Sequence, residues 1–204
     1  MAITLDQIKE LRSRTGVGIS NVKEALEASK GDMEKAIIYL REKGISKGAK
    51  RAGRQAENGF IAHYVHGDGT IAVLVELNSE TDFASRSEKF RSLAHDLALH
   101  IAANNPEYTA IDDIPEDVLE TEKAIYKKDL KGKPDEVQEK ILEGKLQKFY
   151  EEVVLLEQVF VKDDKKKVKD LINEALASIG EKIEISRFVR FEIATPSNSC
   201  GINE

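Results

Sequence analysis

The chain has 204 residues, of which 41% are hydrophobic and 33% charged, and a formal net charge of −6. The length is enough for one large domain or two small ones, and the composition is that of a rather polar globular protein. No run approaches the roughly 20 apolar residues that span a bilayer, and residues 1–6 lack the basic and apolar segments of a secretory signal, so the sequence predicts a cytoplasmic protein. The single cysteine, Cys200, excludes an intrachain disulfide and a zinc site built from several cysteines.

Charge is unevenly distributed along the chain. Residues 1–55 carry a net charge of +5, and the remainder carries −11. The basic first part favours an acidic partner surface. The acidic remainder argues against a protein whose main task is to bind nucleic acid, because such proteins are usually basic.

Residues 1–44 are predicted to form three short helices. Thr4 and Gln7 have the spacing of a capping box at the start of the first helix, and Gly44 is a plausible end for the third. Apolar residues recur at helical spacing in each of them: Leu5, Ile8 and Leu11, then Val22, Ala25 and Leu26, then Met33, Ala36, Ile37 and Leu40. About 40 residues make a marginal core, which favours a docking domain over an enzyme.

Residues 45–56 are rich in basic side chains, namely Lys47, Lys50, Arg51 and Arg54. Two interpretations remain open. The segment is either a solvated linker or linker helix, or a basic contact to a partner.

Residues 59–77 have the clearest pattern of a β-hairpin. Residues 60–66 and 70–77 are rich in β-branched and aromatic residues, and Gly67, Asp68 and Gly69 supply a short connection. The second strand is apolar on both faces over residues 71–75, which predicts a central strand or one covered on both sides.

Residues 78–83 are predicted to be a short strand-to-helix loop that ends in Phe83. The following helix begins with a capping box from Ser85 to Glu88. Its apolar stripe should pack on the hairpin: Phe90, Leu93, Ala94, Leu97 and Ile101. Two interpretations of Phe83 remain open, because a loop between rigid elements can display a side chain, whereas large apolar residues usually fill a core.

The remaining chain predicts helices followed by one more strand. Residues 115–152 have the pattern of two helices joined by a tight turn, an antiparallel helical hairpin. Asp163 and Asp164 are expected to cap a further helix that ends at Gly180. Residues 183–193 alternate apolar and polar side chains, which predicts a third strand with one buried face. Residues 195–204 are expected to be a flexible tail.

Motifs for catalysis or nucleotide binding are absent from the sequence. There is no GxxxxGK[ST] phosphate-binding loop and no GxSxG nucleophile elbow. The spacing of the four histidines does not favour a metal site; they are His63, His66, His95 and His100. The residues therefore predict a binding protein that is not an enzyme and needs neither a cofactor nor a metal.

Several stretches, taken together and in order, resemble translation elongation factor Ts. They are Leu11 to Ile19 with Val22 to Leu26, Glu76 to Phe83, Gly144 to Leu146 with Phe149, Leu156 to Val161, and Arg187 to Glu192. The resemblance covers residues 3–194, and the length matches the short form of the family. One departure is Val159, where the family often has proline.

The resemblance implies an α+β fold in three parts. A ubiquitin-associated-like three-helix docking domain occupies residues 1–44, followed by the basic linker. A core of about three antiparallel strands packed with helices occupies residues 57–194, and a projecting helical hairpin lies at about residues 115–152. The short form is expected to pair with a second copy, making a homodimer.

The resemblance also implies a function and a site. The family promotes nucleotide exchange on elongation factor Tu by disturbing its magnesium and phosphate-binding region. Carried over residue by residue, the segment that does this is Thr81, Asp82, Phe83 and Ala84, with Phe83 as the wedge. Docking of the N-terminal domain is expected to involve Arg12, Thr15, Gly16, Val17, Gly18 and Ile19. No direct contact with nucleic acid or a membrane is expected.

Two other functions remain as alternatives. A ribosome- or nascent-chain-associated binding module would also use a helical bundle and a basic linker. A ligand-binding enzyme would need a concave polar pocket with shifted pKa values.

Overall fold

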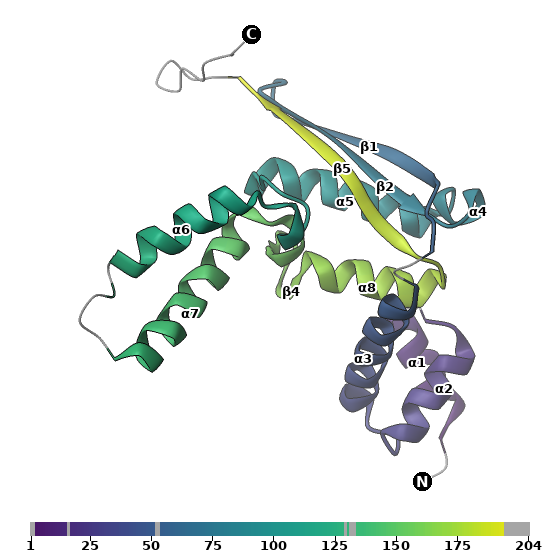
Figure 1. Cartoon of the computed structure of the whole chain (residues 1–204). Helices are drawn as coiled ribbons and strands as arrows, with labels where there is room; N and C mark the ends of the chain where they lie inside the picture. The colour runs from purple at the N-terminus through teal and green to yellow at the C-terminus, as the bar shows by residue number, and fades with distance from the viewer. Residues whose placement is uncertain (1–2, 16, 52–53, 129, 131–133, 194–204) are drawn as a thin grey trace. The chain divides into compact units, whose positions relative to one another are not determined.

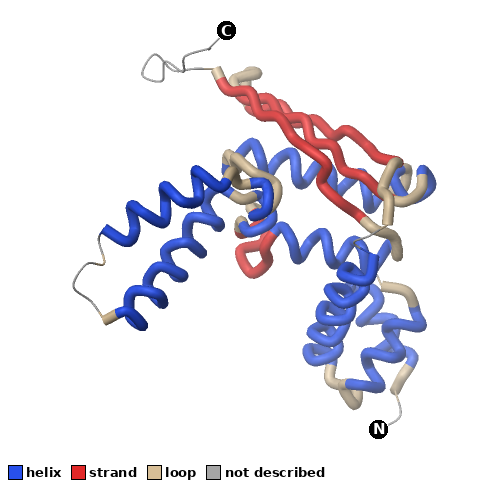
Figure 2. The backbone as a smooth tube through the Cα atoms, viewed as in Figure 1, coloured by secondary structure: helices blue, strands red, loops and turns tan. Residues whose placement is uncertain are grey.

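A computed structural model describes residues 3–15, 17–51, 54–128, 130 and 134–193 (Figure 1). The predicted tail with Cys200 lies outside the described residues, as does Gly16. Helices and strands follow one another along the chain as Figure 2 shows by colour. The predicted fold class is confirmed, since an N-terminal trio of helices precedes a three-stranded antiparallel sheet with helices.

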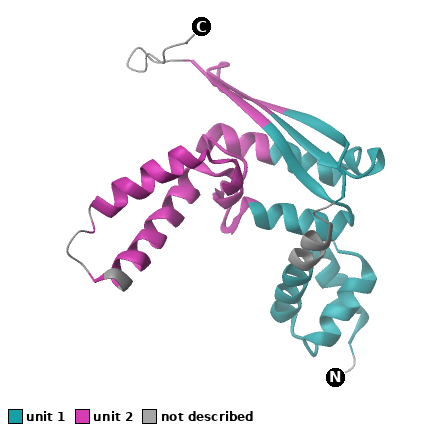
Figure 3. Ribbon diagram, in the orientation of Figure 1, with its two compact units in different colours: residues 1–62, 75–96, 169–187 teal, residues 63–74, 97–168, 188–204 magenta. Residues whose placement is uncertain are grey.

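The chain divides into two compact units (Figure 3). Unit 1 comprises residues 1–62, 75–96 and 169–187, and unit 2 comprises residues 63–74, 97–168 and 188–204. The three strands of the main sheet and the helix over residues 88–104 each contribute residues to both units. The candidate site described below lies entirely in unit 1.

The first three helices are α1 (Leu5–Thr15), α2 (Ile19–Ala28) and α3 (Met33–Arg51). The predicted capping box is present, because the Gln7 N–H donates to Thr4 Oγ1 at 3.3 Å and the Thr4 N–H donates to Gln7 Oε1 at 3.0 Å. The helices close around one apolar cluster: Leu11, Val17, Val22, Ala25, Leu26, Ala36 and Leu40.

The sequence predicts that the third helix ends at Gly44, but the helix continues to Arg51. A glycine inside a helix costs only about 1 kcal/mol relative to alanine, and the residues that follow include good helix formers such as Ala49 and Lys50. The first half of the predicted linker is therefore helical.

The main sheet has the strand order β1 (Asn58–His66), β2 (Ile71–Ser79) and β5 (Ile183–Glu192). The central position predicted for the second strand is confirmed. Helix α5 (Glu88–Asn104) runs along one face of this sheet (Figure 1). The buried side chains of that layer include Val73, Val75, Leu77, Phe90, Leu97 and Ile101.

The buried face predicted for β5 is wrong over the second half of the strand. Ile183 and Ile185 are buried as expected, but Val189, Phe191 and Ile193 are 40%, 65% and 65% exposed. The alternation shifts by one residue, because Arg190 is the shielded side chain at 12% exposure and donates to the α5 carbonyl of Ala102. Such a shift moves every following side chain to the other face of a strand.

In unit 2, α6 (Glu116–Lys128) and α7 (Asp135–Val153) lie side by side as a helical hairpin (Figure 1). Its base packs around a small cluster of Ile114, Val153 and Val154. The connection between the two helices falls largely outside the described residues.

The expected cap at Asp163 and Asp164 is also wrong. These residues begin β4 (Asp163–Lys167), which pairs antiparallel with β3 (Val159–Phe160). Helix α8 (Val168–Ile179) therefore starts only after β4, and Gly180 follows its end with φ +88°. The positive φ explains why glycine stands there. Short 3-10 turns lie at Ile111–Asp113 and Leu155–Glu157.

Candidate partner-binding site

The loop predicted over residues 78–83 is shorter than expected, because β2 continues to Ser79 and a four-residue helix, α4 (Asp82–Ser85), begins after Thr81. Thr81 is its N-cap, and the Thr81 hydroxyl accepts the N–H of Ala84 at 3.3 Å. Ser85 therefore does not cap the next helix, contrary to the prediction. That position belongs to Ser87, whose hydroxyl oxygen accepts the N–H of Phe90 at 3.3 Å.

The ring of Phe83 points away from the chain's own core. It is 82% exposed, the largest value among the exposed large hydrophobic residues described. Its neighbour Ala84 is 2% exposed and anchors the helix from beneath. The interpretation that Phe83 fills the core of this chain is therefore wrong.

Asp82 is exposed beside Phe83 and forms an ion pair with Arg86 at 3.2 Å. Both side chains are largely exposed, so this pair is a weak one. The Asp82 carboxylate therefore stays accessible as an acceptor for a partner's donor group.

A carboxylate from a distant part of the chain supports Thr81. Glu181, at the turn between α8 and β5, accepts the Thr81 N–H at 3.0 Å and the Thr81 hydroxyl at 2.8 Å. The Ser79 hydroxyl donates to the Thr81 carbonyl at 2.9 Å. The residue before α4 is thus held through its N–H, its hydroxyl and its carbonyl.

Glu80 completes the support. Its Oε1 accepts the backbone N–H of Lys182 at 2.7 Å, and its Oε2 pairs with the guanidinium of Arg54 at 2.9 Å. The Asn58 amide donates to the Glu80 carbonyl at 3.0 Å. Arg54 was considered as a partner contact from the sequence, and the structure places it against the chain's own Glu80.

Sequence reasoning did not identify Glu181 or Lys182. The sole local signal is that Glu181 follows the helix-ending Gly180. A contact between residues a hundred positions apart has no periodic pattern that a single sequence could display.

Electrostatics near the site are set by a pair on the adjoining strands. The Arg187 guanidinium donates to Glu76 Oε2 at 2.8 Å and, together with the Asn78 amide, lowers the pKa of Glu76 below its ordinary value. Glu76 therefore stays ionised at neutral pH, and the pair ties β5 to β2 just before the segment that leads to Phe83.

The predicted N-terminal docking residues divide by exposure. Arg12, Gly18 and Ile19 are exposed, with Ile19 at 48%. Thr15 is half-buried, and its hydroxyl donates to the Leu11 carbonyl at 2.7 Å. Val17 is 4% exposed and belongs to the bundle core.

Among the hollows on the described part of unit 1, two bear on the choice of site. One is lined by Lys9, Arg12, Ser13 and Lys89, so that α1 and α5 together present three basic side chains. This hollow joins a predicted docking residue to the helix that follows α4.

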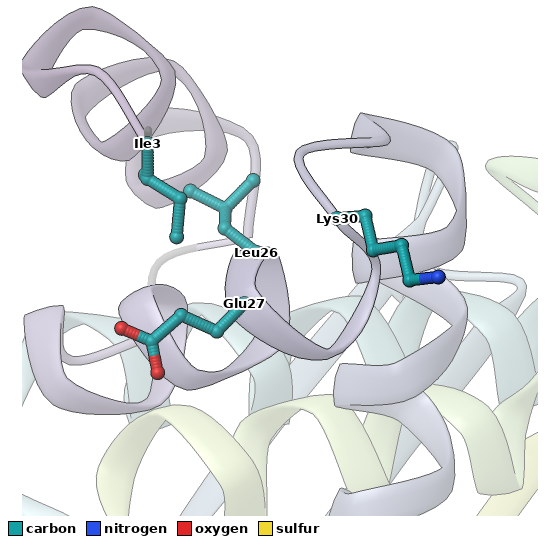
Figure 4. A pocket seen from close by; sticks show the side chains of 4 residues that line it. All are labelled: Ile3, Leu26, Glu27 and Lys30. Carbon is teal, nitrogen blue, oxygen red and sulfur yellow. The ribbon is translucent and has the colours of Figure 1, made fainter. Parts of the chain in front are cut away.

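The second hollow lies on the three-helix bundle and is lined by Ile3, Leu26, Glu27 and Lys30 (Figure 4). Ile3 and Leu26 point toward each other, whereas the charged ends of Glu27 and Lys30 point apart. These charged ends do not converge on one ligand, so we place the candidate site at Thr81–Ala84.

The described part of the chain shows the features of neither a metal site nor a membrane span. It contains no group of three or more His, Cys, Asp or Glu residues placed to hold a metal ion. None of its helices combines the length and the apolar character that crossing a bilayer demands. The arrangement that is present, an exposed aromatic ring on a braced turn, is suited to insertion between elements of another protein.

Comparisons with known proteins agree on one family. The family model described as Elongation factor TS matches residues 17–195. An Elongation factor Ts from Thermodesulfovibrio yellowstonii is 54% identical over 194 residues, covering 95% of this chain and 97% of its own length. One from Thermotoga maritima is 51% identical over 193 residues, covering 95% and 97%. One from Acetivibrio thermocellus is 52% identical over 192 residues, covering 93% and 89%.

Proposed function

Because the chain belongs to the elongation factor Ts family and is a translation elongation factor, we propose that it promotes the release of GDP from elongation factor Tu. The observation that carries the proposal is the ring of Phe83, 82% exposed on a short helix that the chain's own glutamates hold in place. A soluble domain gains nothing for its own stability from such a ring.

Exchange of this kind requires differential binding and no covalent step. A protein that binds the nucleotide-free GTPase more tightly than the GDP-bound form must weaken GDP binding by the same factor. Insertion of Phe83 between elements of the GTPase would bury an aromatic side chain, which can contribute a few kcal/mol. The displaced elements would be those that hold magnesium and the phosphates.

The other residues of the segment have separate roles in this proposal. Asp82 accepts a hydrogen bond from the GTPase, and Ala84, being buried, fixes the helix that carries the ring. Thr81 is the N-cap that starts this helix. No cofactor is needed on this chain.

The N-terminal helices provide the second contact. We infer that Arg12, Gly18 and Ile19 dock on the nucleotide-binding domain of the GTPase, with Thr15 and Val17 shaping the turn from within. The hollow lined by Lys9, Arg12, Ser13 and Lys89 supports this, because its basic side chains complement an acidic surface.

We also propose that the protein acts as a homodimer. Within unit 2, the outer face of the sheet exposes five apolar side chains: Val65, Leu74, Val189, Phe191 and Ile193. Large apolar side chains exposed on one face of a sheet mark an interface, and a symmetric pair is the commonest closed assembly. A second copy would cover β2 on its outer side, as the apolar pattern of this strand predicts.

The expected location is the cytoplasm, where protein synthesis takes place.

The direct experiment is stopped-flow release of fluorescent GDP from elongation factor Tu, with and without this chain. The proposal predicts that release accelerates with the concentration of added protein. Release at the spontaneous rate across all concentrations, from a protein shown to be folded, would contradict it.

A further inference from the structure

Two distant segments beneath α4 exchange hydrogen bonds. Glu181 accepts the Thr81 N–H at 3.0 Å, and in the opposite direction Glu80 accepts the Lys182 N–H at 2.7 Å. Each glutamate therefore satisfies the backbone donor that stands next to the other glutamate. We call this arrangement of Glu80, Thr81, Glu181 and Lys182 the glutamate clamp.

The Thr81 hydroxyl connects the clamp to the helix. It donates to Glu181 Oε1 at 2.8 Å and accepts the N–H of Ala84 at 3.3 Å. A threonine hydroxyl has one proton and can rotate, so its engagement with Glu181 leaves the lone pairs directed to the cap. The carboxylate of Glu181 thus sets the orientation of the group that starts α4.

Helix α4 depends on such external contacts. It has four residues, far fewer than the roughly 12 that an isolated helix needs for even marginal stability. Phe83 lies on this helix and has little contact with the chain's core, being 82% exposed. The direction of its ring is therefore set by what holds Thr81 on one side and by burial of Ala84 on the other.

We propose that Glu181 is a positioning residue for nucleotide exchange: its carboxylate holds Thr81 so that the ring of Phe83 is preorganised for insertion into the GTPase. This inference rests on the proposed function of Phe83. Hydrogen bonds to an ionised carboxylate are stronger than neutral ones. A ring on a turn without this support would be ordered only upon binding, which weakens the apparent affinity by the fraction of competent molecules.

The test compares Glu181→Ala with Glu184→Ala. The two substitutions remove the same charge from the same end of β5, but the Glu184 carboxylate is 41% exposed and pairs with the Lys182 ammonium. We expect Glu181→Ala to slow GDP release about tenfold at protein concentrations below saturation, which corresponds to loss of roughly one strong hydrogen bond. Glu184→Ala should change release by less than about twofold.

A background without the ring separates positioning from a general effect on folding. If Glu181 acts through Phe83, adding Glu181→Ala to Phe83→Ala should slow release by less than about twofold further, because the effects of coupled residues do not add. A tenfold loss in both backgrounds would overturn the inference. Amide hydrogen exchange should show a selectively faster Thr81 N–H in Glu181→Ala.

Failure of this inference can be told apart from failure of the proposed function. If Phe83→Ala slows release and Glu181→Ala does not, Glu181 is not a positioning residue and the exchange function stands. If the unaltered chain does not accelerate release, both fail. Should Glu181→Ala not fold, Thr81→Val removes the hydroxyl while keeping the backbone N–H, and it should show the same dependence on Phe83; the same loss with and without the ring would again overturn the inference.

Discussion

His100 on α5 donates through Nε2 to Oε1 of Gln158 at 3.0 Å, inside the core of unit 2. The opposite ring nitrogen, Nδ1, accepts the N–H of Val161 at 3.2 Å. The Gln158 amide in turn donates to the Glu152 carbonyl at 2.7 Å. One neutral tautomer of the imidazole therefore connects α5 to the chain that follows α7, and protonation of Nδ1 would set a proton against the Val161 donor.

The pH dependence of stability follows from this geometry. Burial lowers the pKa of His100 below its ordinary value of 6.5, so the unfolded chain binds this proton more readily than the folded chain. Its contribution to stability is complete above pH 6.5 and is lost as the pH falls through the depressed folded value. Urea unfolding should show the free energy of unfolding declining over this window.

Substitutions identify the group responsible. His100→Gln should lower stability at pH 7.5 by about 1–3 kcal/mol and flatten the decline at lower pH. His95→Gln, at an exposed position on the same helix, should keep the decline. An unchanged decline in His100→Gln would show that other groups cause it.

Two phenylalanines should respond in opposite ways to truncation. Phe90 is fully buried, so Phe90→Ala should lower the free energy of unfolding by about 3–5 kcal/mol. Phe83→Ala should change it by less than about 0.5 kcal/mol, because the ring is exposed. Thermal and urea unfolding measure both. A loss of several kcal/mol in Phe83→Ala would show that the ring stabilises the chain itself.

Oligomeric state should depend on the outer face of the sheet in unit 2. Phe191→Glu places a charge on the apolar face, and we expect it to convert the proposed dimer to a monomer of 22.7 kDa. Ile125→Glu is the control, since Ile125 is also exposed, at 46%, but lies on α6. Sedimentation velocity measures the result. The proposal is wrong if both variants sediment like the unaltered chain.

Alanine substitutions at two glycines should change the free energy of unfolding in opposite directions. A methyl group added at Gly59 would lie 2.7 Å from the backbone carbonyl of Leu77, whereas one added at Gly144 would meet nothing within 4 Å. Gly59→Ala should therefore destabilise the chain by about 1–3 kcal/mol, and Gly144→Ala should stabilise α7 by about 0.5–1 kcal/mol. Urea unfolding of the two variants provides the comparison, and equal shifts would contradict it.

Local features of the fold could be predicted from the sequence because their signals lie within a few residues. The Thr4–Gln7 capping box, the central β2 strand and the stripe of α5 are examples. The predicted end of α3 at Gly44 was wrong because the low helix propensity of one glycine costs little free energy, and the helix-forming residues that follow outweigh it. The division into a docking domain, a linker and a core stays a prediction.

The inner and outer faces of β5 could not be assigned from the sequence. Ile185 and Phe191 have the same parity, so alternation placed them together, and the one-residue shift between them has no signal in composition. The glutamate clamp was missed for a different reason, since Thr81 and Glu181 meet only through the fold. The exposure of Phe83 was undecided until the structure placed it, because the pattern allowed both outcomes.

Release of labelled GDP from elongation factor Tu, measured by stopped flow with the unaltered chain and with Phe83→Ala, tests the central claim most directly. The account predicts that the unaltered chain accelerates release and that the variant, equally folded, is slower by at least about tenfold, since an aromatic residue central to an interface contributes about 2 kcal/mol or more. Equal acceleration by both proteins would contradict the claim that the exposed ring drives exchange.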